Sequence, residues 1–107
     1  MRIVKHVNED GSTWLRFEVN ERWFWSALPL ELFENESCVV LNNRPYEDYG
    51  DCRLRKGNIE FELLHDDLFG NMISTNNPQD VPDLQQLAEN ILSSIIKSDG
   101  REKEKQE

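Results

Sequence analysis

The sequence predicts an α+β fold, with an antiparallel sheet of about five to six strands followed by one C-terminal amphipathic helix. Two observations predict it. Apolar and polar residues alternate with period two in several short runs, and an apolar stripe at helical spacing follows Pro82. The helix should cover one face of the sheet. A small β-sandwich or barrel with the helix appended is the alternative.

The first two strands are expected at residues 3–7 and 13–19, joined as a hairpin. Asp10-Gly11 lies between them and is a strong turn signal, because glycine adopts positive φ without steric cost. In the second run Leu15 and Phe17 share one face while Trp14 lies on the other, so this strand should be half-buried.

The middle of the chain is expected to contain further strands. Residues 22–28 are rich in aromatic side chains and predict a third strand, after which Pro29 opens a short helical turn. Residues 38–41 form a continuous apolar run, which is typical of a central strand. Residues 46–51 predict a loop or an irregular edge.

A second hairpin is expected where residues 52–55 and 58–64 flank Lys56-Gly57. Residues 68–73 are ambiguous between a loop and a further short strand, and residues 74–81 read as a polar linker.

The C-terminal helix should begin near Pro82, because proline favours the first helical turn, and should stop at Gly100. Its apolar stripe consists of Leu84, Leu87, Ala88, Ile91, Leu92, Ile95 and Ile96. We therefore expect a single domain over residues 1–98 and a charged flexible tail over residues 99–107.

The cysteines and the N-terminus indicate an intracellular protein. No secretory signal or membrane-spanning run is visible, so Cys38 and Cys52 are expected to be reduced, buried thiols in a cytoplasmic protein.

The pattern leaves two roles open for the tryptophans. Trp14 lies on the face opposite Leu15, and Trp23 and Trp25 alternate with Phe24, so at least one tryptophan should be partly exposed. These rings could either pack in the core or form a contact surface for a partner.

The charge is acidic and uneven. The 107 residues carry 21 Asp or Glu against 12 Lys or Arg, a net charge of -9. Phosphates would repel such a protein, which argues against direct binding to nucleic acid or to an anionic membrane.

Residues 31–67 contain most of the excess negative charge, with ten acids against four bases. Acids can steer a basic protein and tyrosines supply contact area, so the predicted partner-binding residues are Tyr46, Glu47, Asp48, Tyr49, Asp51, Glu60, Glu62, Asp66 and Asp67. A merely solubilising surface is the competing interpretation.

No catalytic motif is present, and we expect no enzyme activity, no cofactor and no metal. His65-Asp66-Asp67 is the one compact group that could ligate an ion. Adjacent residues of a strand point to opposite faces, however, so a polar strand exit is the simpler reading.

In its size, its acidity and its lack of a signal or catalytic motif, the chain resembles the small cytosolic immunity proteins of bacterial toxin systems, of the contact-dependent growth inhibition type. The resemblance implies a non-enzymatic inhibitor that occludes the active site of a basic cognate toxin, such as a nuclease. We expect a monomer when free. The alternatives are an acidic secretion chaperone or adaptor and a phage-type nucleic-acid mimic.

Overall fold

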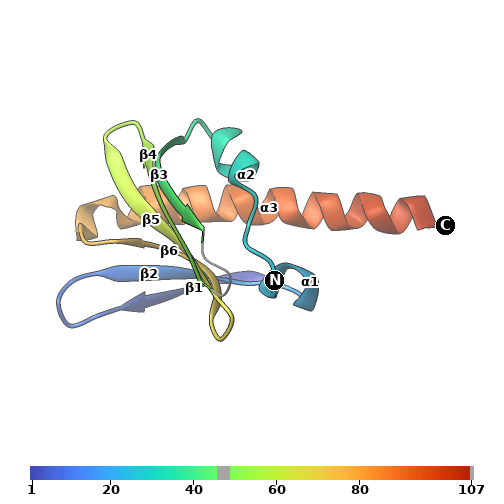
Figure 1. Cartoon of the computed structure of the whole chain (residues 1–107), viewed down its shortest axis with the longest axis horizontal. Helices are drawn as coiled ribbons and strands as arrows, with labels where there is room; N and C mark the ends of the chain where they lie inside the picture. Colours follow the sequence, from blue (N-terminus) through green and yellow to red (C-terminus); the bar gives the residue numbers. More distant parts are fainter. Residues whose placement is uncertain (46–48, 107) are drawn as a thin grey trace.

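The computed structural model describes residues 1–45 and 49–106, and the side chains within residues 1–42 and 51–99. It has the predicted α+β class, a six-stranded antiparallel sheet with a long C-terminal helix across one face (Figure 1). The strands are β1 (Arg2–Val7), β2 (Thr13–Glu18), β3 (Val39–Pro45), β4 (Tyr49–Lys56), β5 (Ile59–Asp66) and β6 (Gly70–Thr75), and their spatial order is β1-β2-β6-β5-β4-β3. The sheet is open, with β1 and β3 at its edges, so the alternative of a barrel or sandwich is wrong.

Both predicted hairpins are confirmed. β1 pairs with β2 around a turn in which Gly11 has a φ of 89° and the Asn8 N–H donates to the Ser12 carbonyl at 2.8 Å. β4 pairs with β5 around Gly57, whose φ is 61°. At both turns the chain reverses through a left-handed backbone conformation that glycine adopts without strain.

The third strand expected over residues 22–28 is wrong. The chain instead forms a short helix, α1 (Glu21–Phe24), because the Asn20 side chain accepts a hydrogen bond from the Trp23 N–H and caps it. The segment after α1 is held by Asn71 on β6. The Asn71 amide donates to the Trp23 and Ser26 carbonyls, at 3.0 and 2.9 Å, and its oxygen accepts from the Leu28 N–H at 3.1 Å.

The helical turn expected after Pro29 is confirmed as α2 (Leu30–Glu34). The run at residues 38–41 does lead into a strand, but β3 lies at the edge of the sheet and not at its centre. Its Val39 and Leu41 are correspondingly exposed. Apolar character alone did not distinguish an edge strand from a central one.

The ambiguous stretch from residue 68 divides at Gly70, where β6 begins. β6 runs on to Thr75, so the first part of the expected linker is strand. A 3₁₀ turn, η1 (Pro78–Asp80), then leads into the helix α3 (Val81–Gln106). The helix does not stop at Gly100 as predicted, and the expected domain boundary at residue 98 lies within it.

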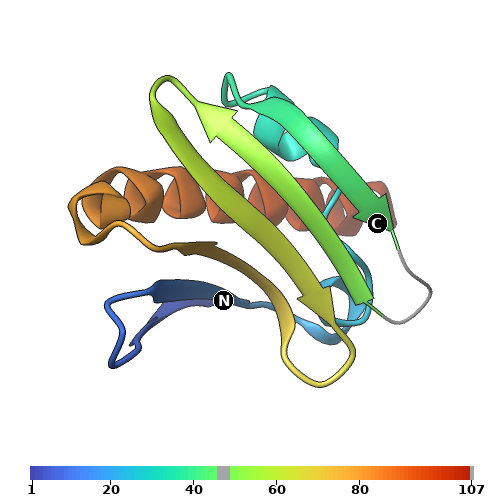
Figure 2. The ribbon, with the colours of Figure 1, turned by 60° about the vertical axis from the view of Figure 1, so that its left-hand side comes forward.

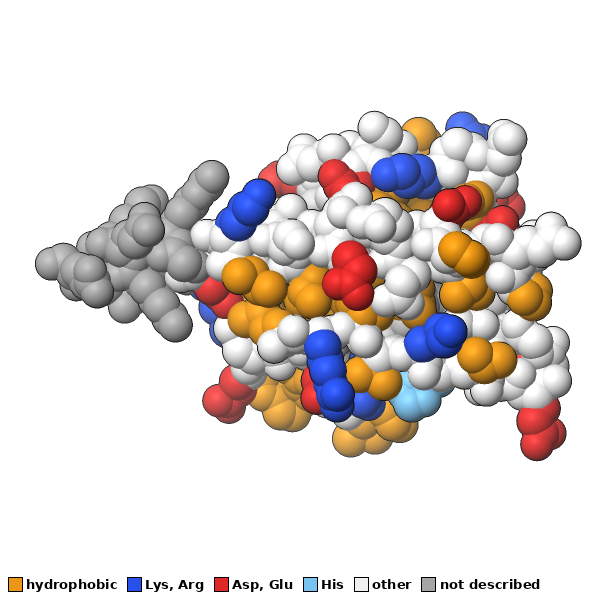
Figure 3. Space-filling view, turned by 180° about the vertical axis from the view of Figure 1, so that it is seen from behind, with side chains coloured by type: hydrophobic (Ala, Val, Ile, Leu, Met, Phe, Trp, Pro, Cys, Tyr) orange, Lys and Arg blue, Asp and Glu red, His pale blue; other side chains and the backbone are white. Residues whose placement is uncertain are grey.

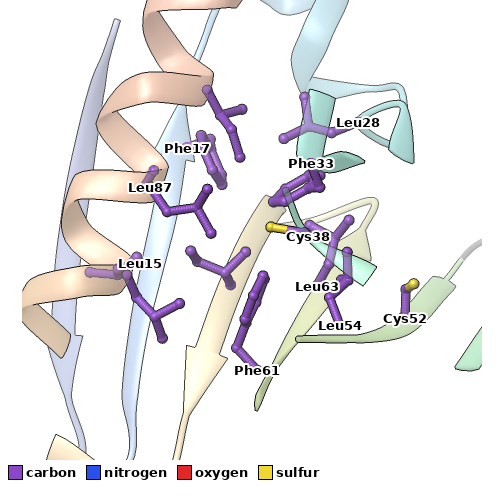
Figure 4. Close-up of a cluster of buried hydrophobic side chains, with 14 of the residues drawn as sticks. Leu15, Phe17, Leu28, Phe33, Cys38, Cys52, Leu54, Phe61, Leu63 and Leu87 are labelled. Atoms are coloured by element: carbon purple, nitrogen blue, oxygen red, sulfur yellow. The ribbon is translucent and has the colours of Figure 1, made fainter. Parts of the chain in front are cut away.

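The core lies between α3 and the sheet (Figure 2). Figure 4 shows Leu87 of α3 pointing into the space between the helix and the strands that carry Phe17 and Phe61. The predicted stripe is buried except for Ile96, at the solvent edge of the helix. Within the described residues, no helix is long and apolar enough to span a membrane.

Candidate functional site

The face of the sheet opposite α3 holds most of the predicted acids that the structure describes, and Figure 2 looks onto part of it. Glu60, Glu62 and Asp66 alternate along β5 and therefore share this face. Asp51 joins them from β4, because its register partner is Leu64. We call these four residues the acidic half of the uncovered face.

The register brings three of these acids around one apolar residue. Leu64 lies opposite Asp51, and Glu62 and Asp66 are its neighbours two places away on β5. Glu62 and Asp66 are therefore the diagonal neighbours of Asp51 across the two strands, with Cα atoms about 7–8 Å from its own, so one binding partner can contact these carboxylates together. Leu64 itself is only 7% exposed.

Basic residues oppose two of the acids. Arg53 is the register partner of Glu62 and Arg55 is that of Glu60. Within the described part of the chain, neither pair comes close enough to form an ion pair. The acidic half is thus a surface of mixed sign whose carboxylates are available to other cations.

The other predicted site residues lie elsewhere. Asp67 is exposed in the turn after β5, and Tyr49 is the first residue of β4, where the structure describes its backbone alone. Tyr49 and Asp51 belong to a strand, so the loop predicted over residues 46–51 is wrong for its second half. Tyr46, Glu47 and Asp48 lie outside the described residues.

The group His65-Asp66-Asp67 does not converge. The Nδ1 of His65 lies 3.1 Å from the Asn71 side-chain oxygen on the helix side of the sheet. Asp66 lies on the opposite face and accepts a hydrogen bond from the Leu68 N–H at 2.7 Å, which closes the turn. Among the described residues, no three potential ligands gather around a point that could hold a metal ion.

Cys38 and Cys52 are both buried and are not bonded to each other. Burial raises the pKa of each thiol, which keeps both in the unreactive protonated form at neutral pH. They pack within the core and offer no nucleophile at the surface.

A broad polar groove of about 770 Å³ opens at the free end of the β4–β5 hairpin. Arg53, Arg55 and Glu60 line one side, and Thr75, Asn77 and Asp80 line the other. The groove joins the acidic half, so a partner docked there meets charges and amides in place of an apolar anchor.

The second half of the uncovered face is aromatic, and the sequence indicated only part of it. A hollow of about 370 Å³ is lined by His6, Asn8, Trp14, Arg16, Phe69 and Met72, from β1, β2, β6 and the turns beside them. The alternation in β2 placed Trp14 away from the core, and it is 36% exposed. Phe69 was missed, because nothing in the polar turn around it indicated that it lies beside Trp14 in space.

Figure 3 shows the molecule from behind the view of Figure 1, and the side chains at this surface differ in kind from those of the acidic half. Hydrophobic side chains gather across its middle, and acidic and basic groups lie singly among them. This view shows no acidic cluster among the described side chains, so the acids of β4 and β5 are not part of a uniform coat.

A scan of protein-family models, a search of curated proteins and a search of solved structures each found no match to this chain.

Proposed function

We propose that this chain is a non-enzymatic protein-binding inhibitor, an immunity protein that neutralises a basic toxin inside the cell by covering its active site. The observation that carries the proposal is the acidic half, where Asp51, Glu62 and Asp66 surround Leu64 on an open sheet face. Carboxylates spaced in this way can pair with lysines and arginines that would otherwise bind a phosphate-bearing substrate.

Two further observations support this reading. The strand carboxylates of the acidic half form no ion pairs within the described residues, so a partner does not have to displace an existing bridge. Arg53 and Arg55 interrupt the acids at regular intervals, which favours a protein partner of matching pattern over mimicry of a continuous phosphate array.

The test is co-expression of the chain with the basic toxin encoded beside it, followed by measurement of cell survival and of binding kinetics. The combined variant Asp51→Asn, Glu60→Gln and Glu62→Gln removes three negative charges from the acidic half. It should lower the affinity by about tenfold or more, mainly through a slower association rate that depends less on salt.

The matched control is Glu31→Gln, Glu34→Gln and Glu89→Gln, which removes the same charge from exposed positions on α2 and α3. It should leave the affinity within about twofold of the unmodified chain, since distant exposed charges are screened. Equal losses in the two triple variants would show that net charge alone matters. The absence of any complex with the toxin would refute the proposal.

A further inference from the structure

The hollow beside Trp14, which we call the aromatic hollow, has a floor and walls suited to an apolar side chain. Met72 forms part of its lining and is 4% exposed although no helix covers this face. Trp14 and Phe69 contribute ring surface, and Phe69 is 54% exposed. Exposed aromatic rings around a shielded apolar floor are typical of the anchor points of protein interfaces.

Arg16 is the one Lys, Arg, Asp or Glu among the residues that line the hollow, in a protein of net charge -9. The guanidinium groups of Arg2 and Arg16 both approach one carboxylate, that of Glu18, with N···O distances of 3.3 and 3.8 Å. Two cations therefore share one anion. The Nε of Arg16 is also buried without a hydrogen-bond partner among the described residues. The Arg16 side chain is 34% exposed, so the accessible part of its guanidinium can pair with a carboxylate brought by a ligand.

The surroundings favour a length of polypeptide over a small molecule. Leu68, next to Phe69 in the turn before β6, is a further exposed apolar residue beside the lining. β1 forms an edge of the sheet, and His6 on this strand is part of the lining. Trp14 and Arg16 are two residues apart on β2 and share this face, so they match the alternate side chains of an extended segment lying along the strand.

We propose that the aromatic hollow binds an extended segment of a partner protein that carries an apolar side chain and a carboxylate two residues apart. The apolar side chain occupies the space between Trp14, Phe69 and Met72, and the carboxylate pairs with the guanidinium of Arg16. This site lies on the other half of the uncovered face and is independent of the inhibitor function proposed above.

The probes are two blocked peptides, acetyl-Thr-Val-Phe-Thr-Asp-Thr-amide and the same peptide with Lys in place of Asp. Phe and Asp are two residues apart and so share one face of an extended chain. In NMR titrations of the full chain, the Asp peptide should shift the Trp14 indole and Met72 methyl signals. It should bind about tenfold more tightly than the Lys peptide, as a charge-assisted pair allows.

Three variants separate the contributions of the site. Arg16→Gln should reduce the preference for the Asp peptide to about twofold or less, and Phe69→Ala should weaken both peptides. Trp25→Ala is the matched control, because Trp25 is 58% exposed and lies outside the lining of the hollow. It should change neither affinity. Circular dichroism confirms that each variant is folded.

Several results would overturn the proposal. One is the absence of any shift of the Trp14 indole signal up to about 5 mM peptide, a concentration far above the range of a useful contact. Another is equal affinity for the two peptides. Binding of free 3-phenylpropionate as tight as that of the Asp peptide would indicate a small-molecule site instead. Dimerisation of the chain that Trp14→Ala abolishes would identify a second copy as the occupant.

Discussion

The two faces of the sheet bury apolar side chains by different means. On the covered face, Phe17 and Ile73 are fully buried because α3 lies over them. On the uncovered face, Met72 and Leu64 are nearly as buried, yet they stand outside the main core cluster and no helix covers them. Their shielding therefore comes from neighbours on the same side, such as Trp14, Arg16 and Phe69 around Met72.

This difference separates stability from binding. A residue under the helix loses packing on every side when it is truncated, so its cost appears as lost stability. A residue at the rim of the uncovered face keeps contact with water, and its truncation costs the fold little while removing contact area for a partner. The predictions below test this separation.

The largest effect is expected for Phe17→Ala. Phe17 is fully buried between β2 and α3, so the variant should lower the free energy of unfolding by about 3–5 kcal/mol. Urea denaturation followed by circular dichroism measures it. A loss of less than about 1 kcal/mol, the range of surface substitutions, would mean that the helix does not cover this face as described.

The next largest effect is expected for Asn71→Ala. This side chain is fully buried and satisfies the Leu28 N–H and two carbonyls of the segment after α1. Leaving one buried N–H and two partly buried carbonyls without this partner should cost about 2–4 kcal/mol in urea denaturation. Asn76→Ala, at an exposed position just after β6, is the control and should change the stability by about 0.5 kcal/mol or less. Equal effects of the two would show that the segment is not held by Asn71.

The elements that the sequence predicted correctly are those whose signals are local. The alternation in β2, the glycines at the hairpin turns and the stripe of α3 act over a few residues. The helix α1 was missed because its anchors are distant. The Trp23 indole donates to Asp99, 76 residues away, and Asn71 holds the chain that follows. No local pattern contains those contacts.

The same reason explains what was missed in the site. The alternation of Glu60 and Glu62 placed them on one face, and the pairing of β4 with β5 then added Asp51. The aromatic hollow instead depends on β2 pairing with β6, two strands separated by about half of the chain. Strand order is a property of the whole fold, so Trp14 could be identified as exposed while its neighbour Phe69 could not.

Trp14→Ala tests the uncovered face of the sheet, as Phe17→Ala tests the covered one. Because about a third of the residue stays exposed, the variant should lower the free energy of unfolding by about 1–2 kcal/mol, below the Phe17→Ala effect. It should nevertheless weaken binding of the Asp peptide severalfold, since aromatic rims dominate contact energy. Thermal denaturation and the peptide titration measure the two effects. A stability loss comparable to that of Phe17→Ala would remove the distinction between the faces.

The smallest effect is expected for Asp10→Asn, at the hairpin tip between β1 and β2. Hydrogen bonds from the Ser12 hydroxyl and N–H, at 2.6 and 2.9 Å, lower the pKa of the Asp10 carboxyl below its usual range. A lowered pKa in the folded state stabilises the fold above the unfolded-state pKa and is lost as the pH falls through the folded-state value. The unmodified chain should therefore melt slightly higher than Asp10→Asn at pH 7, and this difference should vanish as the pH falls through the lowered folded-state pKa.

Comparing the two melting temperatures at each pH isolates Asp10, because all other carboxyls titrate in both proteins. The control is Glu9→Gln at the adjacent exposed position, which keeps the Asp10–Ser12 hydrogen bonds and should therefore keep the pH dependence assigned to Asp10. Asp10 lies outside both the core and the aromatic hollow, so its variant should leave peptide binding unchanged. A stability difference that grows as the pH falls would contradict the sign of the shift, and altered peptide binding would show that the hairpin tip belongs to the site.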